Sequence, residues 1–197
     1  MRSTEPVPYP EAARGLLRDT IIDAVDTLAR SRGWPATTMS QVAEVAGVSR
    51  QTVYNEFGSR QTLVEAYVTR EVESLVAEVE TAVREHADDP SAALLAAFGL
   101  FLKLASDEPI IRIIVADAES SHLMRLLTNL GTSLADDRIA RLITDVWPQA
   151  GAEDAELIAD SLVRLAISHA VAPAADPETT SRKVTRLVGP LIKEILG

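Results

Sequence analysis

The chain has 197 residues, no cysteine and a formal net charge of −10, with 47% hydrophobic residues. A chain of this length can bury about 70% of its unfolded surface, so it needs no disulfide or structural metal to fold, and the absence of cysteine excludes thiol chemistry. Prolines occupy the N-terminus where a signal peptide would be apolar, and Lys103 interrupts the longest apolar segment, Ala92 to Ala105. We therefore expect a soluble, cytoplasmic protein with no membrane partner.

The acidic excess lies outside the N-terminal third of the chain. Residues 1–70 hold eight arginines and eight acidic residues, whereas residues 71–197 hold 11 basic and 21 acidic residues. Charges are screened beyond about 8 Å at physiological salt. An arginine-bearing N-terminal unit can therefore bind an anionic partner such as DNA despite the net charge.

Helical periodicity dominates the sequence, and strand-type alternation is absent. Residues 1–10 contain three prolines and are expected to be disordered. The expected helices cover residues 11–31, 39–46, 50–57, 59–86, 91–106, 109–119, 121–147, 153–172 and 178–196. The segment 92–105 is apolar on nearly every side and is expected to be buried all round. The fold class is all-α with about nine helices.

The second and third helices have unusually clear boundaries. Residues 38–41 read as a capping box, which fixes a helix start at Met39, and Gly47 is suited to end that helix. Ser49 then caps the next helix, with Val48 and Val53 at the positions of a hydrophobic staple. Two short helices joined by a glycine turn are the layout of a helix-turn-helix, whose second helix enters the major groove of DNA.

The second of these helices carries side chains that suit base recognition. Val53 and Phe57 are expected to face the core, which leaves polar residues for the outer faces. Arginine can bind guanine, and glutamine or asparagine can pair with adenine. We therefore expect Arg50, Gln51 and Asn55 to read bases. Such residues on their own would indicate only a solvated surface, so the prediction depends on their conjunction with the caps, staple and glycine turn.

The stretch from Thr38 to Ser49, TMSQVAEVAGVS, resembles the N-terminal signature of the TetR family of regulators, as does the pattern Tyr54-x-x-Phe57-x-x-Arg60-x-x-Leu63. The resemblance covers roughly residues 14–67. It implies a homodimer that binds a pseudo-palindromic operator, with a small-molecule pocket and the dimer contact in the C-terminal domain. It also favours repression, with the ligand releasing DNA by changing the spacing of the two heads. We expect a DNA-binding domain over residues 11–58 and a ligand-binding and dimerisation domain over residues 59–197.

The resemblance also places DNA-contacting positions on this chain. Phosphate- or groove-contacting positions fall on Thr38, Ser49, Thr52, Tyr54 and Arg60, with Thr37 as a weaker candidate. The start of the fourth helix at Ser59 and Arg60 offers free N–H groups to a phosphate. Two residues depart from the family pattern: Arg60 replaces a usual lysine, and Glu56 stands where a neutral residue is common, so Glu56 is expected to point away from DNA.

Catalytic and metal-binding patterns are weak. Glu119 and His122 have the spacing of one pair of ligands in a di-iron bundle, but such bundles need two pairs and two further glutamates. We expect neither enzyme activity nor a metal or other cofactor. The main alternative to a ligand-responsive regulator is an architectural DNA-binding protein without a pocket, and a protein–protein scaffold is a third possibility.

The effector is predicted from the apolar helices of the C-terminal domain. The candidate lining residues are Phe98, Phe101, Leu102, Ile110, Ile113, Ile114, Met124, Leu127, Leu130, Trp147 and His169. Most such residues in any bundle are simply core. A pocket among them would be nearly all hydrocarbon, which predicts a small hydrophobic, elongated ligand such as a fatty acid or other lipid in a cavity of roughly 300–1,000 Å³. A carboxylate head would need Arg112, Arg125, Asn129 or His169 as partner.

The last two helices are predicted to form the dimer. Apolar residues recur at helical spacing on both, and two such helices from each subunit can make a four-helix contact. The candidates are Leu162, Leu165, Leu187, Leu191 and Ile195. The alternative is that both apolar stripes pack within one subunit.

Overall fold

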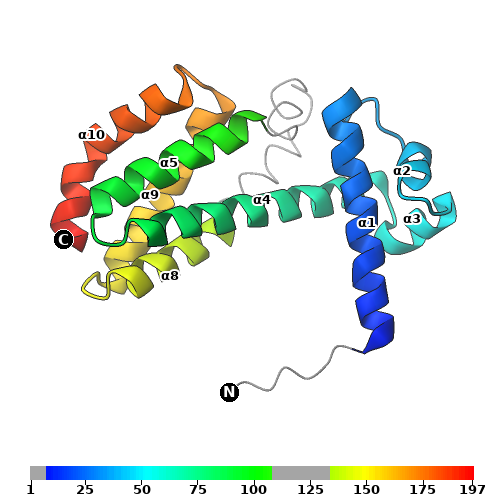
Figure 1. The fold of residues 1–197 in the computed structure, drawn as a ribbon, viewed down its shortest axis with the longest axis horizontal. Coiled ribbons are helices and arrows are strands. Elements are labelled where there is room, and N and C mark those ends of the chain that lie inside the picture. Colours follow the sequence, from blue (N-terminus) through cyan, green and yellow to red (C-terminus); the bar gives the residue numbers. More distant parts are fainter. Residues whose placement is uncertain (1–7, 108–133) are drawn as a thin grey trace. The chain divides into compact units, whose positions relative to one another are not determined.

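The computed structural model describes residues 8–107 and 134–197, and every regular element in these ranges is a helix (Figure 1). This confirms the all-α fold class. The predicted helix 109–119 and the first part of the predicted helix 121–147 lie outside the described residues. The helices are α1 (Tyr9–Arg32), α2 (Met39–Val45), α3 (Arg50–Phe57), α4 (Arg60–Glu85), α5 (Pro90–Asp107), α8 (Asp136–Val146), α9 (Ala152–Val171) and α10 (Pro177–Leu196).

The chain divides into two compact units, Met1–Tyr67 and Val68–Gly197. The first unit contains α1, α2, α3 and the start of α4, and its fully buried side chains include Ile21, Val42, Val53 and Leu63. The boundary between the two units thus falls after Tyr67, nine residues beyond Gly58. The apolar residues at the start of α4 are buried in the first unit together with the helix-turn-helix.

Helix α1 begins two residues earlier than the sequence pattern indicated. Pro8 is the N-cap and Pro10 stands in the first turn, where the missing N–H of proline has no helical partner to lose. The expectation that residues 1–10 are disordered is therefore wrong for Tyr9 and Pro10.

The boundaries of α2 and α3 follow the predicted capping chemistry. The Gln41 backbone N–H donates to the Thr38 hydroxyl at 3.3 Å, and the Thr38 N–H donates to the Gln41 side chain at 2.9 Å, which completes the capping box. Gly47 has φ of 68°, a conformation that favours glycine. The Thr52 N–H then donates to Ser49 Oγ at 3.0 Å, which caps α3.

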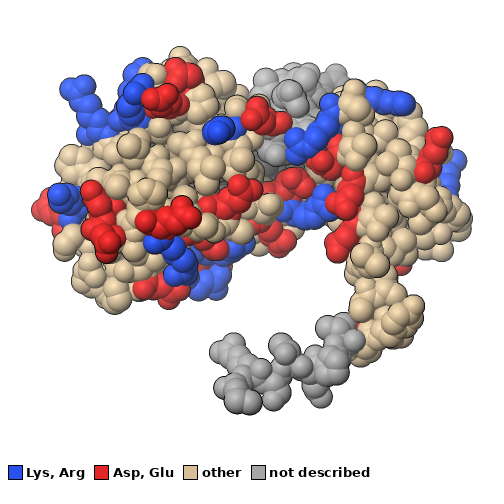
Figure 2. Space-filling view, in the orientation of Figure 1, with Lys and Arg blue, Asp and Glu red and all other residues tan. Residues whose placement is uncertain are grey.

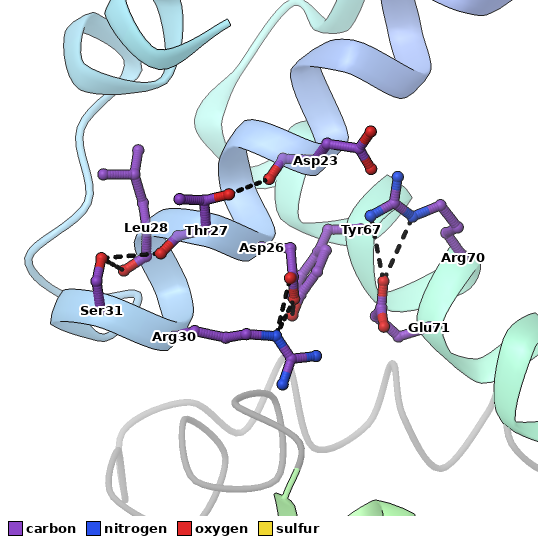
Figure 3. Close-up of polar contacts among 9 residues, drawn as sticks. All are labelled: Asp23, Asp26, Thr27, Leu28, Arg30, Ser31, Tyr67, Arg70 and Glu71. Carbon is purple, nitrogen blue, oxygen red and sulfur yellow. Dashed lines mark hydrogen bonds and ion pairs between the residues drawn. The ribbon is translucent and has the colours of Figure 1, made fainter.

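A polar contact joins α1 to the start of α4 inside the first unit (Figure 3). The side chain of Tyr67 is fully buried, and its hydroxyl donates to Asp26 Oδ1 at 2.9 Å. The single N–H of Arg30 Nε is shared between the two oxygens of the same carboxylate, at 3.0 Å from Oδ1 and 2.8 Å from Oδ2. A buried tyrosine hydroxyl needs such a partner, and this one fixes the register between the two helices.

The second unit contains the rest of α4 with α5, α8, α9 and α10. Arg138 of α8 donates to both carboxylate oxygens of Glu80 on α4, at 2.9 and 2.6 Å, and Trp147 Nε1 donates to the Ala87 carbonyl at 2.9 Å. Helices α4 and α8 therefore run side by side in the same direction. Figure 1 shows α5 on the other side of α4, with α10 beside α5.

Small residues bring α5 and α10 close together. A Cβ atom at Gly99 would lie 3.3 Å from Ser181 Oγ, and one at Gly189 would lie 3.5 Å from Ser91 Oγ. The Ser91 hydroxyl also donates to the Gly189 carbonyl at 3.4 Å. The two helices are antiparallel, since residue 91 meets 189 and residue 99 meets 181.

Helix α5 is long and apolar enough to cross a membrane by length and composition alone. Its buried residues, among them Leu94, Phe98 and Leu102, belong to the core that the second unit forms with α8, α9 and α10, which is how a core helix behaves. The expectation that it is buried all round is wrong, because Leu95 is 40% exposed and Lys103 is also exposed.

Candidate DNA interface and ligand cavity

The outer surface of α3 presents the polar side chains predicted to contact DNA. Val53 and Phe57 are buried, as predicted, and this orientation leaves Arg50, Gln51 and Asn55 exposed. The base-reading roles stay predictions.

These side chains are paired along the helix. Gln51 Nε2 donates to Asn55 Oδ1 at 2.8 Å, so the two amides lie together on one face. Arg50 lies over the ring of Tyr54, with Cζ 5.3 Å from the ring centroid and Nη2 3.4 Å from the hydroxyl. Each pair holds a long side chain in a defined position, which lowers the entropy lost when it meets a base or phosphate.

The hydroxyl-bearing candidates differ in access. Thr38 and Ser49 are exposed and both act as helix caps, and Thr52 is half-buried beside Ser49. Thr37 is 2% exposed and donates its hydroxyl to the Gly33 carbonyl at 3.0 Å. The structure therefore removes the Thr37 side chain from the candidate contacts: it anchors the turn before α2.

Arg60 was predicted to meet a phosphate, and the structure gives it an internal role. Its guanidinium donates to the Trp34 carbonyl at 2.6 Å and to the Thr37 carbonyl at 3.1 Å, and it stacks on the Trp34 ring at 4.2 Å. Partial burial lowers its pKa from the ordinary arginine value. The sequence did not indicate this clamp, since Trp34 and Arg60 are 26 residues apart.

The neighbouring residue Ser59 acts as the predicted cap of α4. The Thr62 backbone N–H donates to Ser59 Oγ at 3.0 Å. The phosphate contact predicted at this helix start stays a prediction for the backbone N–H groups.

Glu56 points toward α1 rather than outward. Its carboxylate pairs with Arg14 at 3.0 Å and Arg18 at 3.7 Å, and Arg18 also stacks on Phe57 at 4.4 Å. These arginines neutralise the acid that sits on the reading helix. No local sequence pattern pointed to Arg14 or Arg18 as part of this surface, because both lie on α1, far from α3 in the chain.

The second unit contains an apolar cavity of about 150 Å³, which we call the apolar slot. All five described helices of the unit line it. Helix α4 contributes Val72, Leu75, Val76, Val79 and Val83, and the other walls include Phe98, Phe101, Trp147 and several alanines. Glu71 is the one charged residue in the described lining, and its carboxylate is bonded by Arg70 at 3.3 Å (Figure 3).

Only some of the residues predicted to bind the ligand line the slot. Phe98, Phe101 and Trp147 line the slot, whereas Leu102 is buried in the core beside it. His169 is not part of the lining; it is half-buried, with its ring 6.3 Å edge-on from that of Phe98. The other candidates lie outside the described residues: Ile110, Ile113, Ile114, Met124, Leu127 and Leu130, with the head-group partners Arg112, Arg125 and Asn129.

Two features of the slot differ from the prediction. Its volume of about 150 Å³ is below the expected range of roughly 300–1,000 Å³. The valines of α4 form an entire wall and were not predicted as lining, although they recur at helical spacing along this helix.

The predicted dimer residues fall into two groups. Leu187 and Leu191 on α10 are 78% and 58% exposed, so they are available to a partner. Leu162 lines the slot, and Leu165 and Ile195 pack partly buried against the core of their own subunit. Those three side chains face inward, because α9 and α10 also close the core of the unit.

Comparisons with known proteins agree with this architecture. The model of the tetR family of bacterial regulatory proteins matches residues 21–67, and the model of the bacterial tetracyclin repressor C-terminal domain matches residues 89–190. The HTH-type transcriptional regulator AlkX of Mycobacterium tuberculosis is 34% identical over 187 residues, which are 93% of this chain and 89% of that protein.

Two solved structures show the same fold. The repressor AlkX of Dietzia sp. strain DQ12-45-1b, implicated in biodegradation of n-alkanes, is 33% identical with a TM-score of 0.78, over 91% of this chain and 97% of that one. FadR of Thermus thermophilus, solved with lauroyl-CoA, is 21% identical with a TM-score of 0.61, over 87% of this chain and 92% of that one.

The matched domains and the named relatives are transcriptional regulators rather than enzymes. Together, the helix-turn-helix, the helical second unit and the matches along most of the chain show that the protein belongs to the TetR family of DNA-binding transcriptional regulators.

Proposed function

We propose that this protein is a cytoplasmic repressor that binds a pseudo-palindromic operator as a homodimer and is released by an elongated, apolar effector. The observation that carries the proposal is the apolar slot, which is lined by hydrocarbon from five helices. An architectural DNA-binding protein needs no ligand cavity, so the presence of the slot favours a ligand-responsive regulator.

The DNA-binding role of α3 is supported by its exposed polar face. Arg50, Gln51 and Asn55 are the proposed base-reading residues, and Thr38, Ser49, Thr52 and Tyr54 are proposed to position the helix on phosphates or the groove edge. Contacts of the first kind specify sequence, and contacts of the second kind fix register. Arg60 and Thr37 are proposed to support this surface from inside.

The effector class follows from the chemistry of the lining. Burial of each methylene is favourable by about 0.8 kcal/mol, and the lining offers little else to recognise. A ligand dominated by an alkyl chain fits best, and the n-alkane connection of the Dietzia repressor is consistent with such a ligand.

Helix α4 provides a route from effector to DNA. One continuous helix carries both the slot wall from Glu71 to Val83 and the residues Leu63 and Tyr67, which are buried in the first unit. A ligand that shifts α4 therefore acts on the helix to which the reading head is attached.

The proposed dimer uses the outer faces of α9 and α10. Helix α9 carries four acidic residues and one arginine, whereas α10 carries four basic and two acidic residues. Basic side chains gather over α10 in Figure 2. Across a two-fold axis, α9 of one subunit can meet α10 of the other with opposite charge around Leu157, Leu187 and Leu191, which are all strongly exposed. Leu187→Glu should give monomers in sedimentation, whereas an intact dimer would contradict this assignment.

The proposal is tested by titrating the protein–operator complex with straight-chain compounds of eight to 18 carbons. The operator is first selected from random DNA, and release is followed by fluorescence anisotropy. Release that strengthens with chain length supports the proposal. Release by compact polar compounds only would contradict the effector class, and no release by any compound class would favour a non-inducible regulator.

A further inference from the structure

The apolar slot runs along α4, and the helices around it place its two ends consistently. Along α4 the lining runs from Glu71 to Val83, and along the parallel helix α8 it runs from Ala135 to Trp147. Helix α5 follows α4 in the chain and returns beside it, so its lining residue Pro90 lies near Val83 and its lining residue Ala105 lies toward Glu71. We call the end at Val83 and Trp147 the distal end.

The two ends of the slot differ in chemistry among the described residues. Val83, Trp147 and Leu196 gather at the distal end, where the Leu196 carbonyl also accepts a hydrogen bond from Gln149. Toward the other end lies Glu71, the one charged residue in the described lining. This difference favours a ligand whose methyl end lies against Trp147 and whose polar group, where it has one, lies toward Glu71.

Trp147 is held firmly enough to serve as a wall. Its side chain is 7% exposed, and Nε1 donates to the Ala87 carbonyl at 2.9 Å. Its backbone N–H donates to the Ile143 carbonyl at 2.8 Å, which closes the last turn of α8. Both the ring and the backbone of this residue are therefore fixed.

The length of the slot follows from helix geometry. Twelve residues separate Glu71 from Val83, and a rise of about 1.5 Å per residue gives about 18 Å. The volume of about 150 Å³ is the space that the centre of a water molecule can reach. Spread evenly over the length of the slot, it corresponds to a cylinder about 1.6 Å in radius. Adding a water radius of about 1.4 Å gives a slot about 6 Å in diameter. A slot of this diameter holds one unbranched chain. With carbon–carbon bonds of about 1.5 Å, an extended chain advances about 1.25 Å per carbon, so about 14 carbons fill the slot.

We propose that Trp147 sets the upper limit on the length of the alkyl chain that this regulator accepts. The inference rests on the proposed effector class and adds a specificity-determining residue to it. Affinity rises about fourfold for each added carbon while new methylenes are buried, and stops rising at the carbon that reaches the indole.

The test measures the affinity of the full-length protein for straight-chain 1-alkanols of eight to 18 carbons by native mass spectrometry. The wild type should show a break in the chain-length series at about 14 carbons. Trp147→Phe, which removes one ring of the wall, should move the break upward by one to two carbons. Leu196→Ala enlarges the same end from α10 and should move it in the same direction, so the proposal does not depend on the folding of one variant.

Leu95→Ala is the matched control, because Leu95 lies on the exposed side of α5 and does not line the slot. Its break should coincide with that of the wild type. A wild-type break that stays in place in both Trp147→Phe and Leu196→Ala overturns the role of Trp147 and leaves the effector class intact. Absence of binding by every alkanol to the wild type overturns both.

Discussion

Replacement of Arg60 by alanine tests whether this residue stabilises the first unit or neutralises a phosphate. The substitution removes two hydrogen bonds to the Trp34 and Thr37 carbonyls and the stacking contact with the Trp34 ring. Buried hydrogen bonds to a charged group contribute about 1.5–3 kcal/mol each, and an exposed cation–π contact about 0.5–1 kcal/mol. Arg60 is exposed on its outer side, so water can solvate the freed carbonyls. We expect a net loss of about 1–2 kcal/mol.

Arg60→Lys should lower the free energy of unfolding by about half as much as Arg60→Ala does. An ammonium group cannot donate to both carbonyls and also stack on the ring, as the planar guanidinium does. Urea denaturation followed by tryptophan fluorescence measures the change, since Trp34 is the contact partner. Arg84→Ala is the control: Arg84 pairs with exposed Asp145 at 3.5 Å, and its loss should cost at most about 0.5 kcal/mol.

Operator binding separates the two roles of Arg60. If Arg60 acts only through its contacts with Trp34 and Thr37, neither Arg60→Lys nor Arg60→Ala should change the salt dependence of operator affinity. Unaltered stability in Arg60→Ala, together with a salt slope reduced by about one unit, would show that Arg60 contacts a phosphate and would refute the clamp.

Three further substitutions concern the second unit and α1. Gly99→Val should destabilise the protein by about 1–3 kcal/mol through overpacking against Ser181, whereas Gly15→Ala, with open space around it, should stabilise by up to about 1 kcal/mol in thermal unfolding. Burial, followed by the nearby Asp160, raises the pKa of Asp136. Its charged form therefore costs stability, and this cost is absent at low pH and grows as pH rises through the folded-state pKa. Asp136→Asn should raise the urea midpoint at pH 7 but not at pH 3, and an equal gain at both would contradict the burial argument.

Local signals in the sequence predicted the first unit closely. The capping box at Thr38, the cap at Ser49 and the staple valine Val53 depend on residues at most five positions apart, so short-range chemistry fixes them. The buried face of α3 follows from the same spacing. Family resemblance added the DNA-binding role, which the matched domains confirm at the level of the family.

Contacts between distant residues could not be predicted in the same way. The Arg60 clamp joins the start of α4 to a turn 26 residues earlier, and its chemistry depends on Trp34 being placed beneath the guanidinium. The slot wall was misassigned for a related reason: periodicity shows which side of α4 is apolar, but not whether that side faces a neighbouring helix or a space. Exposure of Leu95 likewise depends on which helices cover α5.

The central claim is that α3 reads the operator, and base selection tests it most directly. Wild type and Arg50→Ala are used to select binding sites from a randomised DNA pool, with Arg84→Ala as a control in the second unit, away from α9 and α10. We expect a two-fold symmetric site for the wild type. Arg50→Ala should weaken binding to it by about 1–3 kcal/mol and relax preference at one base pair in each half-site. Identical affinity and base preference in wild type and Arg50→Ala would contradict the placement of the reading helix.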